Sequence, residues 1–287
     1  MRKSAVLIAG PTASGKSALA LTRARETGGI VVNTDALQVY DGLRLITARP
    51  RADETALVPH RLYGTVSPER RFSTGDWARA AAAVIAESEG APLLFVGGTG
   101  LYFDALTAGF ADVPEVSPEA LAWAEAEVAG LSGAERGRLI ADRDPTIAAR
   151  LKAPDPQRVI RALSVIRATG RSLATFQDTP QRPLLEGWGL ERLVLNPERE
   201  VLRQRIAARF TAMLEQGAVD EVQSFLARGL DPTLPAMKAI GVREIGDWLA
   251  GTISREEMVE RAVTATRQYA KRQRTWFRGR MTDWSWI

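Results

Sequence analysis

Residues 8–21 read IAGPTASGKSALAL, and this stretch decides the class of fold. An apolar run ends at Ala9, a glycine-bounded turn follows, and helix-forming residues come after it. The turn matches the pattern G-x-x-x-x-G-K-[ST]. In this motif the backbone N–H groups of the turn and the start of the helix surround a phosphate. The lysine adds a positive charge, and the hydroxyl of the last residue can ligate magnesium. The turn comprises Gly10, Pro11, Thr12, Ala13, Ser14, Gly15, Lys16 and Ser17, which we call the P-loop.

Short apolar runs of the same kind recur along the chain, separated by helical stretches. They read SAVLIAG at 4–10, GGIVVNTDA at 28–36, APLLFVGGTG at 91–100 and WGLERLVLN at 188–196. Such runs indicate parallel strands covered on both faces. We therefore expect an α/β fold with a P-loop parallel-sheet core covered by helices, in which the helix after Gly15 turns Ala18, Leu19 and Leu21 toward the sheet.

A helical segment interrupts this pattern. From 113 to 185 we expect no strand but several capped helices, beginning with Ser117-Pro118 and Asp155-Pro156 and stopping at Gly170. We expect a helical insertion domain at 113–185 inside a core made of 1–112 and 186–287. The rest of the core is predicted to be helical, with Leu202, Ile206, Phe210, Met213 and Leu214 on one face of a helix that ends at Gly217, and a last helix that begins at Ser254.

Composition limits the class of protein. The 287 residues are 45% hydrophobic and 25% charged, as in ordinary globular proteins. The absence of cysteine excludes disulfides and thiolate chemistry. The N-terminal apolar run is too short for a signal peptide, and no stretch reaches the length of a membrane span. We expect a cytoplasmic protein.

The basic residues are unevenly distributed. Between Arg261 and Arg280 there are seven basic residues and no acidic one, and Tyr269, Trp276 and Phe277 are interspersed among them. The segment is either a solvated helix face or a surface for phosphates and stacked bases. Charge alone does not decide between a polyanion partner and solvent.

Asp35 comes directly after the second apolar run. Ligands gather at the carboxyl ends of parallel strands, so this carboxylate is expected to face the phosphate bound at the P-loop. Two interpretations remain open from the residues alone. Asp35 is a general base for the group that attacks the phosphorylated substrate, or it caps a turn and reaches magnesium only through water.

The third run ends in Gly97-Gly98-Thr99 and carries no acid there. Enzymes that hydrolyse nucleoside triphosphates on such a loop usually place a magnesium-binding aspartate at a strand end, so motor-type ATPase activity is disfavoured. The activity of a small-molecule kinase is not disfavoured by this absence. Thr99 either offers its hydroxyl to a substrate or simply caps the next helix.

Several segments in order resemble one family, the bacterial tRNA dimethylallyltransferases, also called isopentenyl-tRNA transferases. They are GPTASGKS, TDALQVY, TARP, PHRL, GGTGLYFDAL, DPQRVIRAL, ARFTAML, KAIGVRE and ATRQYAKRQRTWFR. The first is shared with many phosphate binders, whereas the last two are far more specific. The resemblance covers nearly the whole chain.

The resemblance implies transfer of a dimethylallyl group from its diphosphate to the exocyclic amine of the adenine on the 3′ side of a tRNA anticodon. Carbon, not phosphorus, is then attacked. It implies that the P-loop, with Mg²⁺ on Ser17, stabilises the leaving diphosphate. It further implies that Asp35 accepts the amine proton, that Thr99 hydrogen-bonds near the reacting centre and that Arg209 is a further diphosphate contact.

The resemblance also implies RNA contacts, because the adenine must flip out of its loop to reach such a site. The implied residues are Asp35, Ala36, Leu37, Gln38, Gln157, Arg158, Val159, Ile160, Arg161, Ala239, Ile240, Gly241, Val242, Arg243, Glu244, Lys271, Arg272, Gln273, Arg274, Thr275, Trp276, Phe277 and Arg278. The last eight lie in the acid-free basic stretch. Charge and resemblance thus indicate a tRNA partner independently.

Some positions depart from the family pattern. Ala36 replaces the usual serine after the aspartate, which removes one polar contact expected for the flipped base. Ile46 and Arg49 replace a glycine and a lysine, and Val242 replaces an aromatic residue. His60, the only histidine, is expected to fix a loop.

Two other functions compete with this one. A P-loop small-molecule kinase with a helical lid explains the first hundred residues equally well but leaves the basic terminal helix without a purpose. A nucleic-acid-binding module without catalysis explains that helix but not a complete P-loop facing a carboxylate. We expect a tRNA-modifying prenyltransferase that uses dimethylallyl diphosphate and Mg²⁺ and acts as a monomer.

Overall fold

The computed structural model describes residues 3–111, 113–151, 153–179 and 181–287. Its contacts divide the chain into two compact units, residues 1–107 with 184–287 and residues 108–183. Residue 112, at the boundary expected for the insertion, lies outside the described residues, as do the first two residues of the N-terminal stretch.

The larger unit is built on a six-stranded sheet in which all neighbouring strands are parallel. The strands are β1 (Ser4–Ala9), β2 (Ile30–Asn33), β3 (His60–Arg61), β4 (Leu93–Gly97), β5 (Gly189–Val194) and β6 (Ser285–Trp286), in the order β3-β2-β4-β1-β5-β6. The expected α/β fold with a parallel sheet is confirmed. Since Ala9 pairs with Gly97 and Asn33 with Val96, β1, β2 and β4 end at one level.

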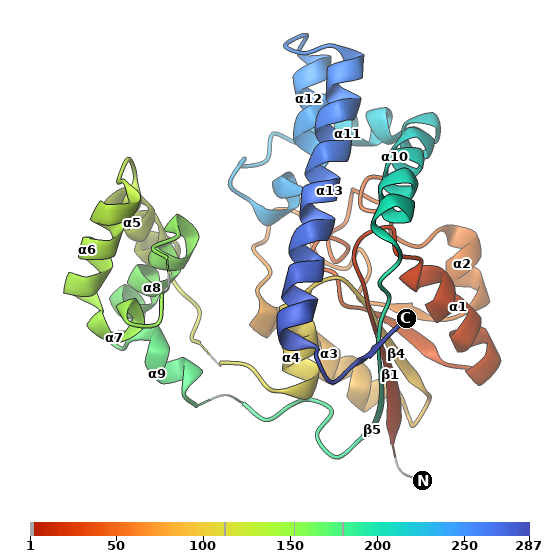
Figure 1. Ribbon diagram of the computed structural model, residues 1–287, viewed down its shortest axis with the longest axis horizontal. Coiled ribbons are helices and arrows are strands. Elements are labelled where there is room, and N and C mark those ends of the chain that lie inside the picture. Colours follow the sequence, from red (N-terminus) through yellow and green to blue (C-terminus); the bar gives the residue numbers. More distant parts are fainter. Residues whose placement is uncertain (1–2, 112, 152, 180) are drawn as a thin grey trace. The chain divides into compact units, whose positions relative to one another are not determined.

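The helices of the larger unit either cover the faces of this sheet or pack beyond the ends of its strands (Figure 1). They are α1 (Lys16–Thr27), α2 (Ala52–Leu57), α3 (Thr74–Glu87), α4 (Gly100–Thr107), α10 (Arg199–Glu215), α11 (Ala218–Leu226), the 3₁₀ turn η1 (Pro235–Lys238), α12 (Val242–Leu249) and α13 (Arg255–Arg280). Figure 1 shows α1 on one face and α3 and α4 on the other. The long helix α13 packs against α10, α12 and α4.

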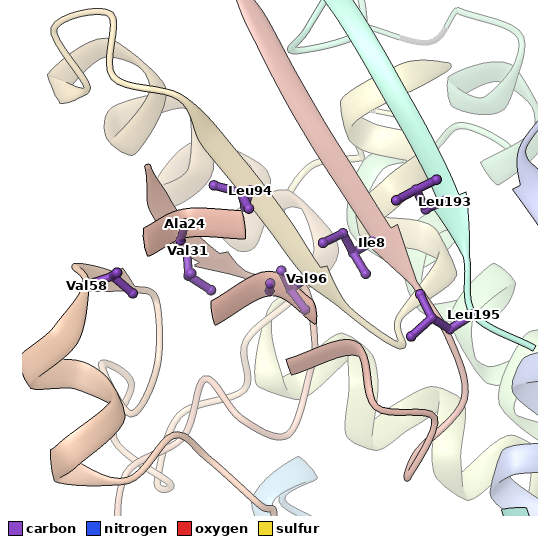
Figure 2. Close-up of a cluster of buried hydrophobic side chains, with 9 residues drawn as sticks. Ile8, Ala24, Val31, Val58, Leu94, Val96, Leu193 and Leu195 are labelled. Atoms are coloured by element: carbon purple, nitrogen blue, oxygen red, sulfur yellow. The ribbon is translucent and has the colours of Figure 1, made fainter. Parts of the chain in front are cut away.

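A cluster of apolar side chains joins α1 to the sheet (Figure 2). It consists of Ile8, Ala20, Ala24, Val31, Val58, Leu94, Val96, Leu193 and Leu195. The expectation for α1 is confirmed for Leu19 and Leu21, which are partly buried and pack against this cluster, and is wrong for Ala18, which is exposed. The small side chains of Ala20 and Ala24, one turn apart, are buried in the cluster and let the helix approach the strands closely.

The helix α10 follows its predicted pattern. Leu202, Ile206, Phe210 and Met213 are buried, and Leu214 is partly buried. At the start of α13, Ser254 accepts a hydrogen bond from the N–H of Glu257, as the capping signal predicted. Within the described part of the chain, no helix combines the length and the apolar character needed to cross a membrane.

The secondary-structure elements described in the smaller unit are all helices, joined by loops. Its helices are α5 (Pro118–Val128), α6 (Gly133–Arg143), α7 (Pro145–Ala148), α8 (Pro156–Thr169) and α9 (Leu173–Gln177). Ser117 and Asp155 cap α5 and α8 as predicted, and Gly170 ends α8 with a φ of 68°. A core of its own, formed by Ala124, Val128, Ile140, Ile147, Val159, Ala162, Leu163 and Ala174, holds these helices together.

Candidate functional site

The P-loop connects β1 to α1, and its backbone is prepared for an anion. Gly15 is the N-terminal cap residue of α1 and supplies no side-chain hydrogen bond to the first turn. The helix therefore begins with N–H groups that a phosphate can satisfy. Ala13 has a φ of 65°, a left-handed conformation that costs a non-glycine residue roughly 1 kcal/mol and is typical of functional turns.

Lys16 is half-buried at the start of α1. Its Nζ donates a hydrogen bond to the carbonyl of Pro11 at 3.4 Å, so the side chain folds back over the P-loop. Burial lowers the pKa of Lys16 to about 8, a shift that the charge of Asp35 opposes and that of Arg209 reinforces. An anion beside the ammonium group would reverse this shift.

Asp35 and Thr99 are brought together at the carboxyl ends of β2 and β4. Oγ1 of Thr99 accepts the N–H of Ala36 at 2.9 Å, and the N–H of Thr99 donates to the carbonyl of Thr34 at 3.1 Å. Oδ1 of Asp35 accepts the N–H of Leu37 at 3.0 Å. The aspartate does cap a turn, but it uses one oxygen for this, and Oδ2 makes no protein hydrogen bond among the described residues.

Two arginines of α10 reach the P-loop from outside. Nη2 of Arg209 donates to Oγ1 of Thr12. Burial lowers the pKa of Arg209, and the charge of Asp35 opposes this shift. Arg205, one turn earlier, points Nη1 at the carbonyl of Ser14 at 3.5 Å. Sequence reasoning missed Arg205, although its spacing of four residues from Arg209 places both on one face of the helix.

Two cavities surround these groups. The smaller is lined by Thr12, Asp35, Arg209, Tyr269 and neighbouring apolar side chains, so a P-loop residue and the candidate base share one pocket. The larger, of about 520 Å³, has the size typical of small-molecule sites. Its charged lining residues are Lys16, Arg44, Arg49, Arg51, Arg205, Arg209 and Glu54, and Ser17 lines it as well. This cavity suits an anion.

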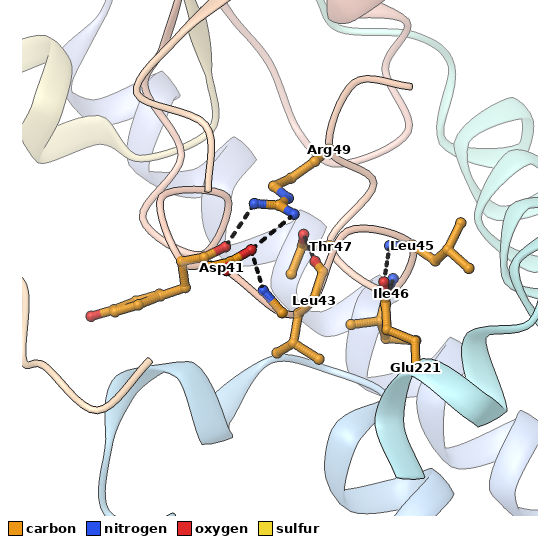
Figure 3. A network of polar contacts seen from close by, with 9 residues as sticks. Asp41, Leu43, Leu45, Ile46, Thr47, Arg49 and Glu221 are labelled. Atoms are coloured by element: carbon orange, nitrogen blue, oxygen red, sulfur yellow. Dashed lines mark hydrogen bonds and ion pairs between the residues drawn. The ribbon is translucent and has the colours of Figure 1, made fainter. Parts of the chain in front are cut away.

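The loop after Tyr40 forms one wall of both cavities. The carboxylate of Glu221, on α11, accepts the N–H groups of Leu45 at 2.8 Å and Ile46 at 2.9 Å (Figure 3). Nη1 of Arg49 donates to the carbonyl of Tyr40 at 3.1 Å. Arg49, which replaces the usual lysine, therefore holds this loop in place as well as lining the larger cavity.

The segments implied in RNA binding are divided between surface and core. On α13, Lys271, Arg272, Thr275 and Arg278 are exposed. Gln273 and Phe277 are buried, Arg274 is half-buried, and Trp276 is half-buried with its ring edge-on to Phe277 at 5.9 Å. The buried side chains pack α13 against the rest of the unit, and the exposed ones face solvent.

The other implied segments are divided in the same way. Near α12, Arg243 is exposed, Ile240 and Glu244 are half-buried, and Ala239, Gly241 and Val242 are buried. On α8 of the smaller unit, Gln157, Arg158 and Arg161 are exposed, Ile160 is half-buried and Val159 lies in that unit's core. After β2, Ala36, Leu37 and Gln38 are half-buried.

His60 lies on β3, where its Nδ1 contacts the carbonyl of Val58 at 2.9 Å. Its ring also lines the larger cavity.

Comparison with known proteins identifies the family. The family model described as IPP transferase matches residues 38–280. The tRNA dimethylallyltransferase of Chelativorans sp. is 50% identical over 290 residues, which cover 99% of this chain and 98% of that protein. The tRNA isopentenylpyrophosphate transferase of Bacillus halodurans has a similar structure, with a TM-score of 0.69, 32% identity and coverage of 100% of this chain and 90% of that one.

A eukaryotic dimethylallyltransferase, whose crystal structures capture it acting on tRNA, is also similar. Its TM-score is 0.79 at 27% identity, over 96% of this chain and 70% of that one. Since a family model and full-length relatives agree along nearly the whole sequence, this chain belongs to the IPP transferase family of tRNA dimethylallyltransferases.

Proposed function

We propose that the chain transfers the dimethylallyl group of dimethylallyl diphosphate to N6 of the adenine next to a tRNA anticodon, on its 3′ side. The bond between C1 of the allyl group and the diphosphate oxygen breaks, and a bond from C1 to N6 forms. Diphosphate leaves, and one proton of the amine goes to a base. The observation that carries this proposal is the pocket shared by Thr12 of the P-loop, Asp35 and Arg209.

The P-loop is proposed to bind the leaving diphosphate through residues 10–17. The N–H groups at the start of α1, Lys16 and Arg209 would donate to the negative charge that grows on the leaving group, and the contact of Arg209 with Thr12 supports this role. Fixed donors of this kind often make the largest contribution to catalysis. The basic lining of the larger cavity supports an anionic substrate there.

Asp35 is proposed as the base and Thr99 as a group that holds it. Oδ1 is anchored on the N–H of Leu37, which fixes the direction of the carboxylate. Oδ2 is then available for the proton of the amine as the nitrogen becomes positively charged. Thr99 fixes the adjoining backbone through the N–H of Ala36, and a contact from its hydroxyl to the diphosphate remains part of the proposal.

A magnesium ion fits the donors at the P-loop. The exposed hydroxyl of Ser17 lines the larger cavity beside Lys16. Mg²⁺ is commonly held by one or two protein oxygens, with phosphate oxygens and water completing its shell. Ser17 would hold the ion, which would supply positive charge to the leaving diphosphate.

The exposed basic residues of α13 and α8 are proposed to bind the RNA. The active form is proposed to be a monomer. The P-loop, Asp35, Thr99 and Arg209 all come from one chain, which supports a monomer as the active form. Sedimentation of the protein with and without an anticodon stem-loop measures this directly.

The decisive experiment is a transfer assay with labelled dimethylallyl diphosphate and an anticodon stem-loop in the presence of Mg²⁺. We expect the label to appear on the adenine beside the anticodon and diphosphate to be released. Release of ADP from ATP with a small acceptor, without labelling of the RNA, would favour the kinase instead.

Asp35→Asn tests the base within the same assay. Asparagine keeps the acceptor for the N–H of Leu37 but has no basicity, so we expect turnover to fall by about 10² to 10⁴ while the stem-loop still binds. Asp220→Asn, at an exposed position of α11, is the matched control. Normal turnover of Asp35→Asn would remove Asp35 as the base.

A further inference from the structure

Gln273 is a buried glutamine in a stretch of α13 that is otherwise largely exposed. Only 5% of the residue is exposed, whereas Lys271, Arg272 and Thr275 around it face solvent. The side chain of Gln273 does not face solvent as its neighbours do. Its amide group is used inside the protein instead.

The amide makes two hydrogen bonds to backbone groups that are distant in sequence. Oε1 accepts the N–H of Thr12, in the P-loop, at 2.9 Å. Nε2 donates to the carbonyl of Gly98, just after β4, at 3.0 Å. An amide suits this position because it offers an acceptor and a donor on neighbouring atoms. One side chain thus joins α13 to the P-loop and to the loop after β4.

The loop after β4 is shaped to let α13 approach. A Cβ atom at Gly98 would lie 2.0 Å from Nε2 of Gln273, and one at Gly100 would lie 2.3 Å from the ring of Trp276. A side chain at Gly98 would displace the amide of Gln273, and one at Gly100 would displace the ring of Trp276. Gln273 and Trp276 are one turn apart, so the contact extends along the helix.

The same loop holds the proposed base. Thr99 lies between the two glycines, and its hydroxyl accepts the N–H of Ala36, next to Asp35. On the other side of the amide, Thr12 is also held by Arg209. Gln273 therefore links the segment proposed to hold the diphosphate with the segment proposed to hold the base.

We propose that Gln273 is a positioning residue that keeps the P-loop in register with Asp35 while its helix binds RNA. This inference rests on the proposed function. Transfer requires the leaving oxygen, the allylic carbon, the amine and the base to be aligned, and a displacement of about 1 Å costs about 10²-fold in rate. Gln273 touches no reacting atom and acts through Thr12 and Gly98.

Gln273→Glu gives a readout that a packing role would not produce. A protonated glutamic acid has a donor and an acceptor like glutamine, whereas the ionised form keeps the bond to Thr12 and turns a charged oxygen toward the carbonyl of Gly98. We expect the single-turnover rate, relative to wild type, to approach one at low pH and to fall about tenfold or more as the carboxyl ionises. The charged groups Lys16, Asp35 and Arg209 are the same in both proteins, so their contribution to the pH dependence cancels in this ratio.

Gln273→Met removes both hydrogen bonds at similar side-chain length. We expect kcat to fall about 10²-fold at every pH. The Kd values for the stem-loop and for inorganic pyrophosphate should change by less than about threefold, because neither ligand contacts the amide. Gln268→Met, on the exposed side of the same helix, is the matched control and should behave as wild type. All rates are taken below the Tm of each variant.

The outcomes separate this inference from the function on which it rests. Transfer at the normal rate by Gln273→Met, or a pH-independent rate ratio for Gln273→Glu, leaves the proposed function intact and overturns the positioning role. A raised Kd for the stem-loop with an unchanged kcat makes Gln273 an RNA-binding determinant and also overturns it. Absence of transfer by the wild type overturns both.

Discussion

Lys16 makes the affinity of the P-loop for anions depend on pH. Burial lowers the pKa of its ammonium group to about 8, so the protein without a bound anion loses this charge as the pH rises above that value. Binding of an anion requires the charged form and takes up a proton. The affinity therefore rises as the pH falls toward 8 and is lost above it, by at most about tenfold per pH unit.

Titration of the protein with inorganic pyrophosphate between pH 6.5 and 9.5 checks this prediction. Lys16→Met should bind more weakly by about 10- to 100-fold at neutral pH and should lack this part of the pH dependence, because only the titration of the ligand remains. Parallel curves for the two proteins would mean that Lys16 is not the group that titrates.

Single residues differ in how far the sequence reveals them. The P-loop follows from its spacing, and the place of Asp35 follows from the end of a strand, because both depend on neighbours in the chain. Glu221 and Gln273 could not be assigned in this way. Their hydrogen bonds join positions 175 to 261 residues apart, and such a pairing leaves no periodic signal in the sequence.

At the scale of elements, α10 presents two arginines to the P-loop, and we expect them to contribute unequally to its affinity for anions. Arg209 is half-buried, whereas Arg205 is exposed, so solvent screens its charge. We expect Arg205→Met to raise the Kd for pyrophosphate about threefold, measured by calorimetry at low salt. Arg203→Met, on the same helix and paired with Glu200 at 3.4 Å, should leave this Kd unchanged. An equal rise of the Kd in both variants would mean that only the net charge of the protein matters and not the position of Arg205.

The exposed face of α13 is predicted to bind phosphates of the RNA. Reversal of two charges, Lys271→Glu with Arg278→Glu, should weaken stem-loop binding and lower the slope of log Kd against log salt by about 0.7 to 0.9 for each lost contact. Pyrophosphate affinity should not change. Arg255→Glu, at the exposed start of the same helix, is the control. Unchanged affinity and slope would make this face a solvated surface only.

Elements with enough apolar residues were predictable, and very short ones were not. The runs that form β1, β2 and β4 are largely buried, and the run that forms β5 is buried at its end, so their apolar residues make them recognisable as strands. The strands β3 and β6 have two residues each, too few for a pattern, and form because longer neighbours offer them partners. On α1 the sequence correctly indicated Leu19 and Leu21 toward the sheet, but it did not reveal that Ala20 and Ala24 are the buried positions of this helix.

At the scale of the whole molecule, the segment 108–183 leaves and re-enters the larger unit at adjacent points. The N–H of Leu184 donates to the carbonyl of Ala105, and that of Leu185 to the carbonyl of Leu106, each at 3.1 Å. The segment also has its own apolar core. Its removal should therefore leave the sheet and its helices intact, because the apolar cluster on the sheet and that of the segment share no residue.

We predict that replacement of residues 108–183 by a Gly/Ser linker of about six residues gives a folded protein that binds pyrophosphate with a Kd within about threefold of the full chain. Stem-loop affinity should fall at least about tenfold, because the exposed Arg158 and Arg161 of α8 are lost. Arg158→Glu with Arg161→Glu in the full chain should reproduce most of this loss, whereas Arg138→Glu, exposed on α6, should not. Stem-loop binding that survives the deletion would assign the grip on RNA to the larger unit alone.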